Sequence, residues 1–389
     1  MRNNLISSRK RDRRGNVIVI ASFMMIFFIG CLAFAIDLGY ILTARTELQR
    51  SADAGALSAV WDLIDEGSFG ADPTLATSIS DARSTANTFV EGNLVRRDAP
   101  SIDLNSANAE DGDVVVGYLG NPSNPDAKLN FSDSSQFNAV TVRVRRTAQQ
   151  NGEVGLFFAR IFGIDGSSLE AEATAVINSH ISGFRIPYDG SNIGILPFAL
   201  DEDTWNDLIA GNADDDWSWD DTNGTISKGS DGIREVNLYP QATGSPGNRG
   251  TVDIGSNNNS TADIARQITD GVTPSDMEHH NGVLEFDENG NLYLNGDTGI
   301  SAGVKDELAS IKGEPRVIPV FRSVTGPGNN ATYTIVKFVG VRIMDVKLTG
   351  AASKKYVMIQ PAAIATKGAI PTTEIGTSDL VFTPGYLVR

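Results

Sequence analysis

The chain has 389 residues, of which 21% are charged and 41% hydrophobic, so it is long enough for two or three folded domains. Its net charge of −16 is unevenly distributed, because residues 1–16 hold six basic side chains and one acidic one, a balance of +5 that leaves −21 for the rest. An acidic body disfavours nucleic-acid binding, and the single cysteine, Cys31, excludes an internal disulfide framework and a cysteine-based metal site.

An uncharged apolar run directly follows the basic N-terminal residues. Residues 17–36 read VIVIASFMMIFFIGCLAFAI, and as a helix they span about 30 Å, the thickness of the hydrocarbon core of a bilayer. A buried core helix is the alternative, but a helix that is apolar all round beside a cluster of cations favours a membrane segment. The positive flank predicts that residues 1–16 stay in the cytoplasm and that the body from Asp37 onward is extracytoplasmic.

The helix is predicted to continue beyond this run to about Ile64, a total length of roughly 70 Å. Apolar side chains recur at three- and four-residue steps, and the first proline is Pro73. The stripe consists of Leu38, Ile41, Leu42, Leu48, Ala52, Ala56, Ala59, Val60 and Leu63. Since Ala33-Phe34-Ala35 has the form of a signal-peptidase site, release after Ala35 is the alternative to a retained anchor.

The upper part of this helix consists almost entirely of small residues. Residues 51–59 read SADAGALSA, and small side chains let two helix backbones approach closely. This face packs on a sheet of the same chain or on helices of partner proteins, and in a pilin-like subunit it does both.

Residues 13–59 resemble the N-terminal segment of the TadG-like and TadE-like proteins of the tight-adherence (Flp) pilus system. The resemblance rests on Arg13-Arg14-Gly15-Asn16, the apolar span, Asp37-x-Gly39-Tyr40, and Leu48-Gln49-x-x-Ala52-Asp53-Ala54-x-Ala56-Leu57. It implies a bacterial, single-pass inner-membrane protein that acts in pilus assembly and meets other pilus-assembly proteins through its N-terminal helix. The candidate assembly-motif residues are Arg14, Gly15, Asn16, Asp37, Gly39, Gln49, Ala52, Asp53 and Ala56.

The chain departs from these families at two points. Prepilins that are cut after a glycine usually carry Glu five residues later, where this chain has Ile20, so processing after Gly15 is not expected. Larger TadG relatives contain a von Willebrand A domain with a D-x-S-x-S metal motif. The nearest matches here lack the final serine, so we expect a short form without that domain: Asp133-x-Ser135-x-Phe137 and Asp165-x-Ser167-x-Leu169.

Residues 37–180 are predicted to form a pilin-like unit in which the long helix lies on a small antiparallel sheet. Helices are expected at 75–92 and, from its apolar spacing, at 153–162, and strands at 113–119, 138–146 and 169–177. If the last two strands pair, the cations Arg143 and Arg145 come opposite Glu170 and Glu172; otherwise all four side chains are solvated.

Residues 181–389 are rich in Gly, Asn and Pro and are predicted to form a β-rich second domain, so the expected fold class is α+β. Residues 282–296 are predicted to be a hairpin with a type I′ turn at Asn289-Gly290. In residues 332–350 the apolar face runs through Val341 and Ile343 and then shifts to Met344 and Val346. This change of phase predicts a β-bulge.

Two catalytic signatures overlap in residues 296–308, GDTGISAGVKDEL. Asp297-Thr298-Gly299 matches the aspartic-protease triplet, but the chain has no second such triplet, and the site needs two carboxylates. A nucleophile elbow at Ser301 needs a later histidine, whereas all three histidines, at 180, 279 and 280, precede it. We therefore expect a turn in which Thr298 or Ser301 caps the helix that follows.

No metal site or cofactor site is expected. Adjacent side chains such as His279 and His280 do not converge on one ion, and a surface loop is the simpler interpretation. The acidic run at 214–221, DDDWSWDD, either binds Ca²⁺ or is a solvated loop that exposes Trp217 or Trp219. The sequence thus predicts a non-catalytic, membrane-anchored structural or assembly component of a Tad pilus. The alternatives are an anchored extracytoplasmic hydrolase and a secreted adhesin released after Ala35.

Overall fold

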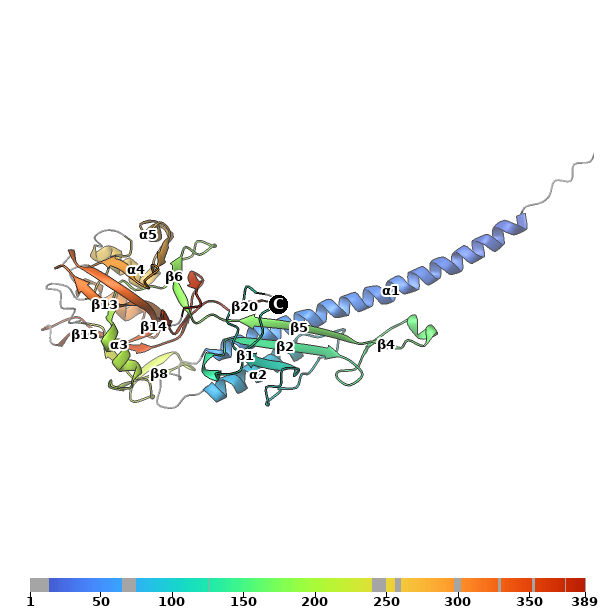
Figure 1. Cartoon of the computed structure of the whole chain (residues 1–389), viewed down its shortest axis with the longest axis horizontal. Helices are drawn as coiled ribbons and strands as arrows, with labels where there is room; N and C mark the ends of the chain where they lie inside the picture. Colours follow the sequence, from blue (N-terminus) through green and yellow to red (C-terminus); the bar gives the residue numbers. More distant parts are fainter. Residues whose placement is uncertain are drawn as a thin grey trace, which may run out of the picture.

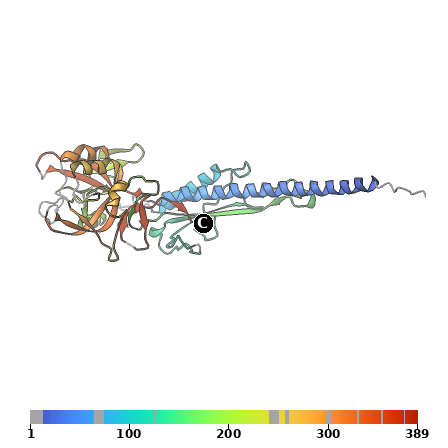
Figure 2. The ribbon, with the colours of Figure 1, turned by 90° about the horizontal axis from the view of Figure 1, so that it is seen from above.

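The computed structural model describes residues 14–64, 75–124, 126–239, 250–255, 260–296, 302–327, 330–351, 354–374 and 376–388. The molecule is α+β, as predicted, and is drawn out along one long N-terminal helix (Figures 1 and 2). A helix-on-sheet unit surrounds the C-terminal half of that helix, and a β-rich body lies beyond it, at the end of the molecule far from the N-terminus.

The long helix α1 runs from Arg14 to Ala59 and ends in a 3₁₀ turn, η1, at Val60–Leu63. Every described side chain from Val17 to Leu32 is exposed, although an 18-residue window of this segment has a mean hydropathy of 2.8. Burial begins with Asp37 and then follows one stripe: Ala44, Leu48, Ala52, Ala56 and Ala59. The predicted stripe is therefore correct from Leu48 onward, whereas Leu38 and Leu42 remain exposed.

A four-stranded antiparallel sheet packs against the upper half of α1, with strand order β1-β2-β5-β20. The unit comprises α2 (Leu75–Gly92), β1 (Val114–Gly117), the 3₁₀ turn η3 (Ser134–Gln136), β2 (Ala139–Arg146), β5 (Leu169–Val176) and β20 (Tyr386–Leu387). Alternate valines of β2 face α1 and α2 in a shared apolar core, as strand periodicity requires. The predicted helix 75–92 and the three predicted strands of this unit are confirmed.

A narrow arm, residues 153–168, projects from this sheet between β2 and β5 and runs alongside α1 toward its N-terminal end (Figure 1). It contains β3 (Val154–Gly155), the 3₁₀ turn η4 (Ala159–Phe162) and β4 (Gly166–Ser167). The helix predicted at 153–162 is wrong. Gly163 turns the chain back with a left-handed φ of 79°, and β3 pairs with β4, so only one helical turn forms.

The distal body is built on a seven-stranded sheet of order β10-β15-β14-β13-β7, in which β12 and β18 also pair with β14. Its helices and turns are α3 (Glu202–Ile209), α4 (Thr261–Asp270), α5 (Pro274–Glu278), η5 (Ala302–Val304) and α6 (Lys305–Ser310). Its longer strands are β6 (Ile181–Arg185), β8 (Trp217–Asp220), β9 (Thr225–Lys228), β11 (Val283–Glu285), β12 (Leu292–Asn295), β13 (Pro315–Thr325), β14 (Thr332–Lys347), β15 (Tyr356–Pro361) and β17 (Ala369–Pro371). Two-residue strands complete it: β7 (Leu200–Asp201), β10 (Val236–Asn237), β16 (Ile364–Ala365), β18 (Ser378–Asp379) and β19 (Val381–Phe382).

Both faces of this sheet are covered. Neighbouring side chains of β13 enter different apolar clusters, Ile318 with residues of α3, α4 and α6, and Val317 with residues of β6 and β11. The predicted bulge in β14 is confirmed, because its pairing with β15 shifts register between Ile343 and Asp345. The hairpin predicted at 282–296 is wrong: a turn is present at Asp287–Asn291, but β11 pairs with β6 and β12 pairs with β14.

Candidate assembly surface along the long helix

Asp37, the first charged residue after the apolar run, joins α1 to the arm. Its carboxylate accepts hydrogen bonds from the backbone N–H groups of Phe157 (2.9 Å), Phe158 (3.0 Å) and Ala159 (2.7 Å), and the residue is 5% exposed. Burial raises the pKa of Asp37, but the three N–H donors favour the ionised form, and the net pKa lies below its ordinary value. A single carboxylate thus fixes the arm beside the outer end of the apolar segment.

Tyr40, one turn further along α1, extends this junction. Its ring lies edge-on to Phe157, with centroids 5.0 Å apart, and the Arg96 guanidinium lies 4.0 Å from the centre of the Tyr40 ring. Arg96 also pairs with Glu47 of α1, at 3.3 Å, and donates its backbone N–H to the same carboxylate at 2.7 Å. The arm, α1 and the segment after α2 therefore form one connected set of contacts.

Three of the motif residues, Gln49, Ala52 and Ala56, hold α1 onto the sheet. The Gln49 amide nitrogen donates to Asp53 and to the backbone carbonyl of Glu172 in β5, both at 2.9 Å. Ala52 and Ala56 are fully buried in the core between α1, α2 and the sheet. The predicted packing of the small-residue face on the chain's own sheet is therefore observed.

The other motif residues lie in different surroundings. Gly39 is on an exposed face of α1, where an added Cβ would meet no atom within 4 Å. Arg14, Gly15 and Asn16 form the first turn of α1, and their side chains lie outside the described set. The structure thus brings together Asp37 and the arm, and Gln49, Asp53 and β5, but it does not gather the motif residues into one site.

Sequence reasoning overlooked a close contact between α1 and α2. A Cβ at Gly55 would lie 2.8 Å from the Val90 side chain and 3.2 Å from the Ala86 carbonyl oxygen. Ser51 donates its hydroxyl to the Val90 carbonyl at 3.1 Å. The run of small residues around Gly55 was the signal for this contact, although it did not reveal which helix would fill the space.

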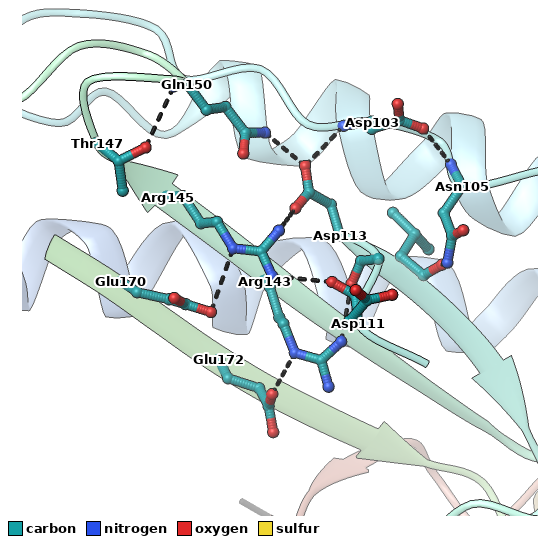
Figure 3. Close-up of polar contacts among 12 residues, drawn as sticks. Asp103, Asn105, Asp111, Asp113, Arg143, Arg145, Thr147, Gln150, Glu170 and Glu172 are labelled. Carbon is teal, nitrogen blue, oxygen red and sulfur yellow. Dashed lines mark hydrogen bonds and ion pairs between the residues drawn. The ribbon is translucent and has the colours of Figure 1, made fainter. Parts of the chain in front are cut away.

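The predicted pairing of charges across β2 and β5 is confirmed. Arg143 lies opposite Glu172 and Arg145 opposite Glu170, and both pairs form ion pairs (Figure 3). Arg145 also pairs with the buried carboxylate of Asp113, just before β1. This network fixes the loop that precedes β1 to the face of the sheet directed away from α1.

The residues considered for catalysis and for metal binding lie away from the long helix. Asp297, Thr298 and Ser301 lie outside the described residues, and α6 begins after Val304 without a side-chain cap. Among the described residues, one trio of carboxylates has oxygens within 4.8 Å of one another: Asp215, Asp231 and Glu235. Only the first belongs to the acidic run 214–221, and backbone N–H groups already donate to all three.

The two tryptophans of the acidic run are partly buried. They belong to β8, which pairs with β9, and the Arg342 guanidinium lies 4.4 Å from the centre of the Trp219 ring. The prediction of a loop that exposes them is therefore wrong, because a short hairpin folds this segment against the body.

Two known protein families match the long helix and the sheet that packs on it. Residues 15–62 match a family model described as Flp pilus-assembly TadE/G-like, and residues 58–175 match one described as Tad-like Flp pilus-assembly. The two matches together cover α1, α2, the arm and the strands up to β5, and they stop before the distal body. No curated protein and no solved structure matches the chain.

Proposed function

We propose that this TadE/TadG-like protein is a non-catalytic structural component of Flp pilus assembly, anchored in the bacterial inner membrane by the first half of α1. A role in pilus assembly follows from the two family matches. A structural role at the membrane is supported by α1, whose two halves differ in their surroundings. The first half is apolar and exposed on all sides, while the second half forms part of the core.

The exposed half needs an apolar environment. Twenty uncharged residues are enough to cross a bilayer, and a helix satisfies its own backbone hydrogen bonds there. The excess of basic residues before the span supports an orientation with the N-terminus in the cytoplasm and the acidic body outside it.

Partner helices in this proposal meet α1 where the chain itself does not cover it. Ala52 and Ala56 are covered by α2 and the sheet, so they contribute to folding rather than to assembly. The open face at Gly39 and the apolar segment below it remain available. These surfaces are where we place the contacts with other pilus-assembly proteins.

The proposal is tested by site-specific crosslinking in a Cys31→Ser background. Gly39→Cys should form crosslinks to other pilus proteins in membranes, whereas Ala52→Cys, buried in the core, serves as the matched control and should form none. Deleting the gene should reduce the number of pili, and the unaltered gene should restore them. Normal piliation without the protein would contradict the proposed role.

Orientation is tested separately. A reporter enzyme that is active only outside the cytoplasm, fused after Arg389, should be active. A stable but inactive fusion would show that the body lies in the cytoplasm.

A further inference from the structure

The tip of the arm, residues 157–164, carries an unusual density of exposed apolar side chains. Ile161 is 80% and Phe162 is 83% exposed, and three more large apolar side chains of the tip are exposed as well: Phe157, Phe158 and Ile164. Contiguous apolar surface of this kind marks a contact with a membrane, a partner protein or a ligand. Within this short segment, Arg160 is the only charged residue.

The tip lies beside the proposed membrane anchor rather than beside the body. An apolar groove of about 670 Å³ separates arm and helix. On the helix side it is lined by Ile26, Ile29, Ala33 and Phe34, and above them by Asp37, Leu38 and Ile41; on the arm side it is lined by Phe158, Ile161 and Phe162. Figures 1 and 2 show the arm running along α1 toward its N-terminal end.

The groove follows α1 from Ile26 up to Ile41, and its lower part lies at the level of the apolar run. From Ile36 down to Ile26 the helix descends about 15 Å, half of the hydrocarbon thickness. Asp37 holds the base of the tip at the upper limit of this zone. The Arg160 side chain turns back toward β3, where its guanidinium approaches Gly155, so its charge points away from the deep end as a snorkelling arginine does.

Most backbone N–H groups of the tip have hydrogen-bond partners within the protein. Hydrocarbon offers no hydrogen-bond partners, so N–H groups that enter it need partners within the protein. Those of Phe157, Phe158 and Ala159 donate to Asp37. Three more N–H groups of the tip donate to carbonyl oxygens within the arm, those of Ile161, Gly163 and Ile164, and so does that of Leu156 just before the tip.

We propose that the arm tip, residues 157–164, inserts into the outer hydrocarbon leaflet beside α1, and that lipid acyl chains fill the groove between them. This inference rests on the membrane anchoring proposed above. The arm is then a second attachment to the bilayer, and it sets the tilt and rotation of the helix-on-sheet unit relative to the membrane.

The test uses the full chain with Cys31→Ser in lipid nanodiscs, with one new cysteine carrying a fluorescent label and with nitroxide-bearing lipids as quencher. Phe162→Cys reports on the tip, Phe23→Cys on the anchor, and Tyr188→Cys, on a body residue that is 96% exposed, on water. We expect strong quenching at positions 23 and 162 and little at 188. Adding Asp37→Ala should reduce quenching at 162 and leave that at 23 unchanged.

The remaining outcomes separate the two proposals. Quenching at 23 but not at 162 would overturn the insertion of the arm while the anchor stands. No quenching at either position would overturn the anchor itself. In a further outcome, the label at 162 is protected from quenching only when two copies of the protein share a disc, and residue 162 crosslinks to the second copy. The groove then binds protein rather than lipid, and the proposal is wrong.

Discussion

Asp113 concentrates the polar contacts of the helix-on-sheet unit on one carboxylate. It is 2% exposed and accepts hydrogen bonds from the backbone N–H of Asp103 (2.8 Å) and the side chain of Gln150 (2.5 Å), besides its ion pair with Arg145 (Figure 3). A buried carboxylate with three donors stabilises the fold only as long as every donor keeps its partner.

Replacing Asp113 by Ala should therefore lower the free energy of unfolding by about 1–3 kcal/mol, because it removes the shared acceptor of three donors that lie at the edge of the core. Glu170→Ala is the matched control, since Glu170 pairs with the same Arg145 but its side chain is 52% exposed. That control should cost at most about 1 kcal/mol. Denaturant unfolding in detergent measures both, and equal losses would contradict this assignment of the network.

Glu235 makes stability depend on pH in the distal body. Burial raises its pKa to about 7, with the charges of Asp215 and Asp231 adding to the effect against the opposing N–H of Asp216. The folded state therefore favours the protonated acid. Its contribution to stability is complete below pH 4.5, the ordinary value, and is lost as the pH rises to about 7.

Glu235→Gln mimics the protonated acid and should stabilise the protein at pH 8 by on the order of 1–3 kcal/mol. At pH 4.5 the variant and the parent should unfold at nearly the same denaturant concentration. A variant that is less stable than the parent at pH 8 would show that the carboxylate is ionised in the fold.

Among the helices and strands, the sequence predicted correctly those elements that place one face against the core. β2, β5 and α2 each place one face against the core, so their periodicity is visible in the sequence. The phase shift at Met344 predicted a real bulge for the same reason. The arm and the 282–296 segment were misassigned because their apolar residues serve contacts made elsewhere, on α1 and on two different strands, which no local window contains.

The two glycines Gly39 and Gly55 of α1 give a matched test of its packing. Gly39→Ala should stabilise the helix by up to about 1 kcal/mol, because the new methyl group meets open space. Gly55→Ala places a methyl group 2.8 Å from the Val90 side chain and should cost on the order of 1–3 kcal/mol, which exceeds the gain in helix propensity. Thermal unfolding followed by circular dichroism compares them, and a stabilised Gly55→Ala would mean that α1 and α2 are loosely packed.

Over the whole molecule, the sequence predicted the long apolar helix but not the contacts that join this helix to the arm. The importance of Asp37 was visible in the motif, whereas its partners lie 120 to 122 residues further along the chain and share no pattern with it. The same holds at the other end of the molecule. Tyr386 and Leu387 return from the distal body to pair with β5, and their sequence does not reveal it.

This returning strand, β20, ties the distal body to the helix-on-sheet unit. Besides its pairing with β5, Val388 donates its N–H to the Thr174 carbonyl at 2.9 Å, and Asn178 donates to the Tyr386 hydroxyl at 3.1 Å. Ending the chain after Pro384 removes these bonds and leaves the edge of β5 unpaired, at a cost of about 2–4 kcal/mol for several net hydrogen bonds.

The distal body and the helix-on-sheet unit each keep their own apolar cluster in that truncated chain, so both should stay folded. The connecting segment between them, residues 177–181, should become more accessible. Limited proteolysis should then cleave this segment faster than in the parent and release the distal body as one resistant fragment. A chain that lacks only Arg389 is the control and should resist like the parent. If the truncated chain is instead degraded throughout, β20 is required for folding of the sheet itself, and unchanged resistance would mean that the connection through 177–181 suffices to hold the two parts together.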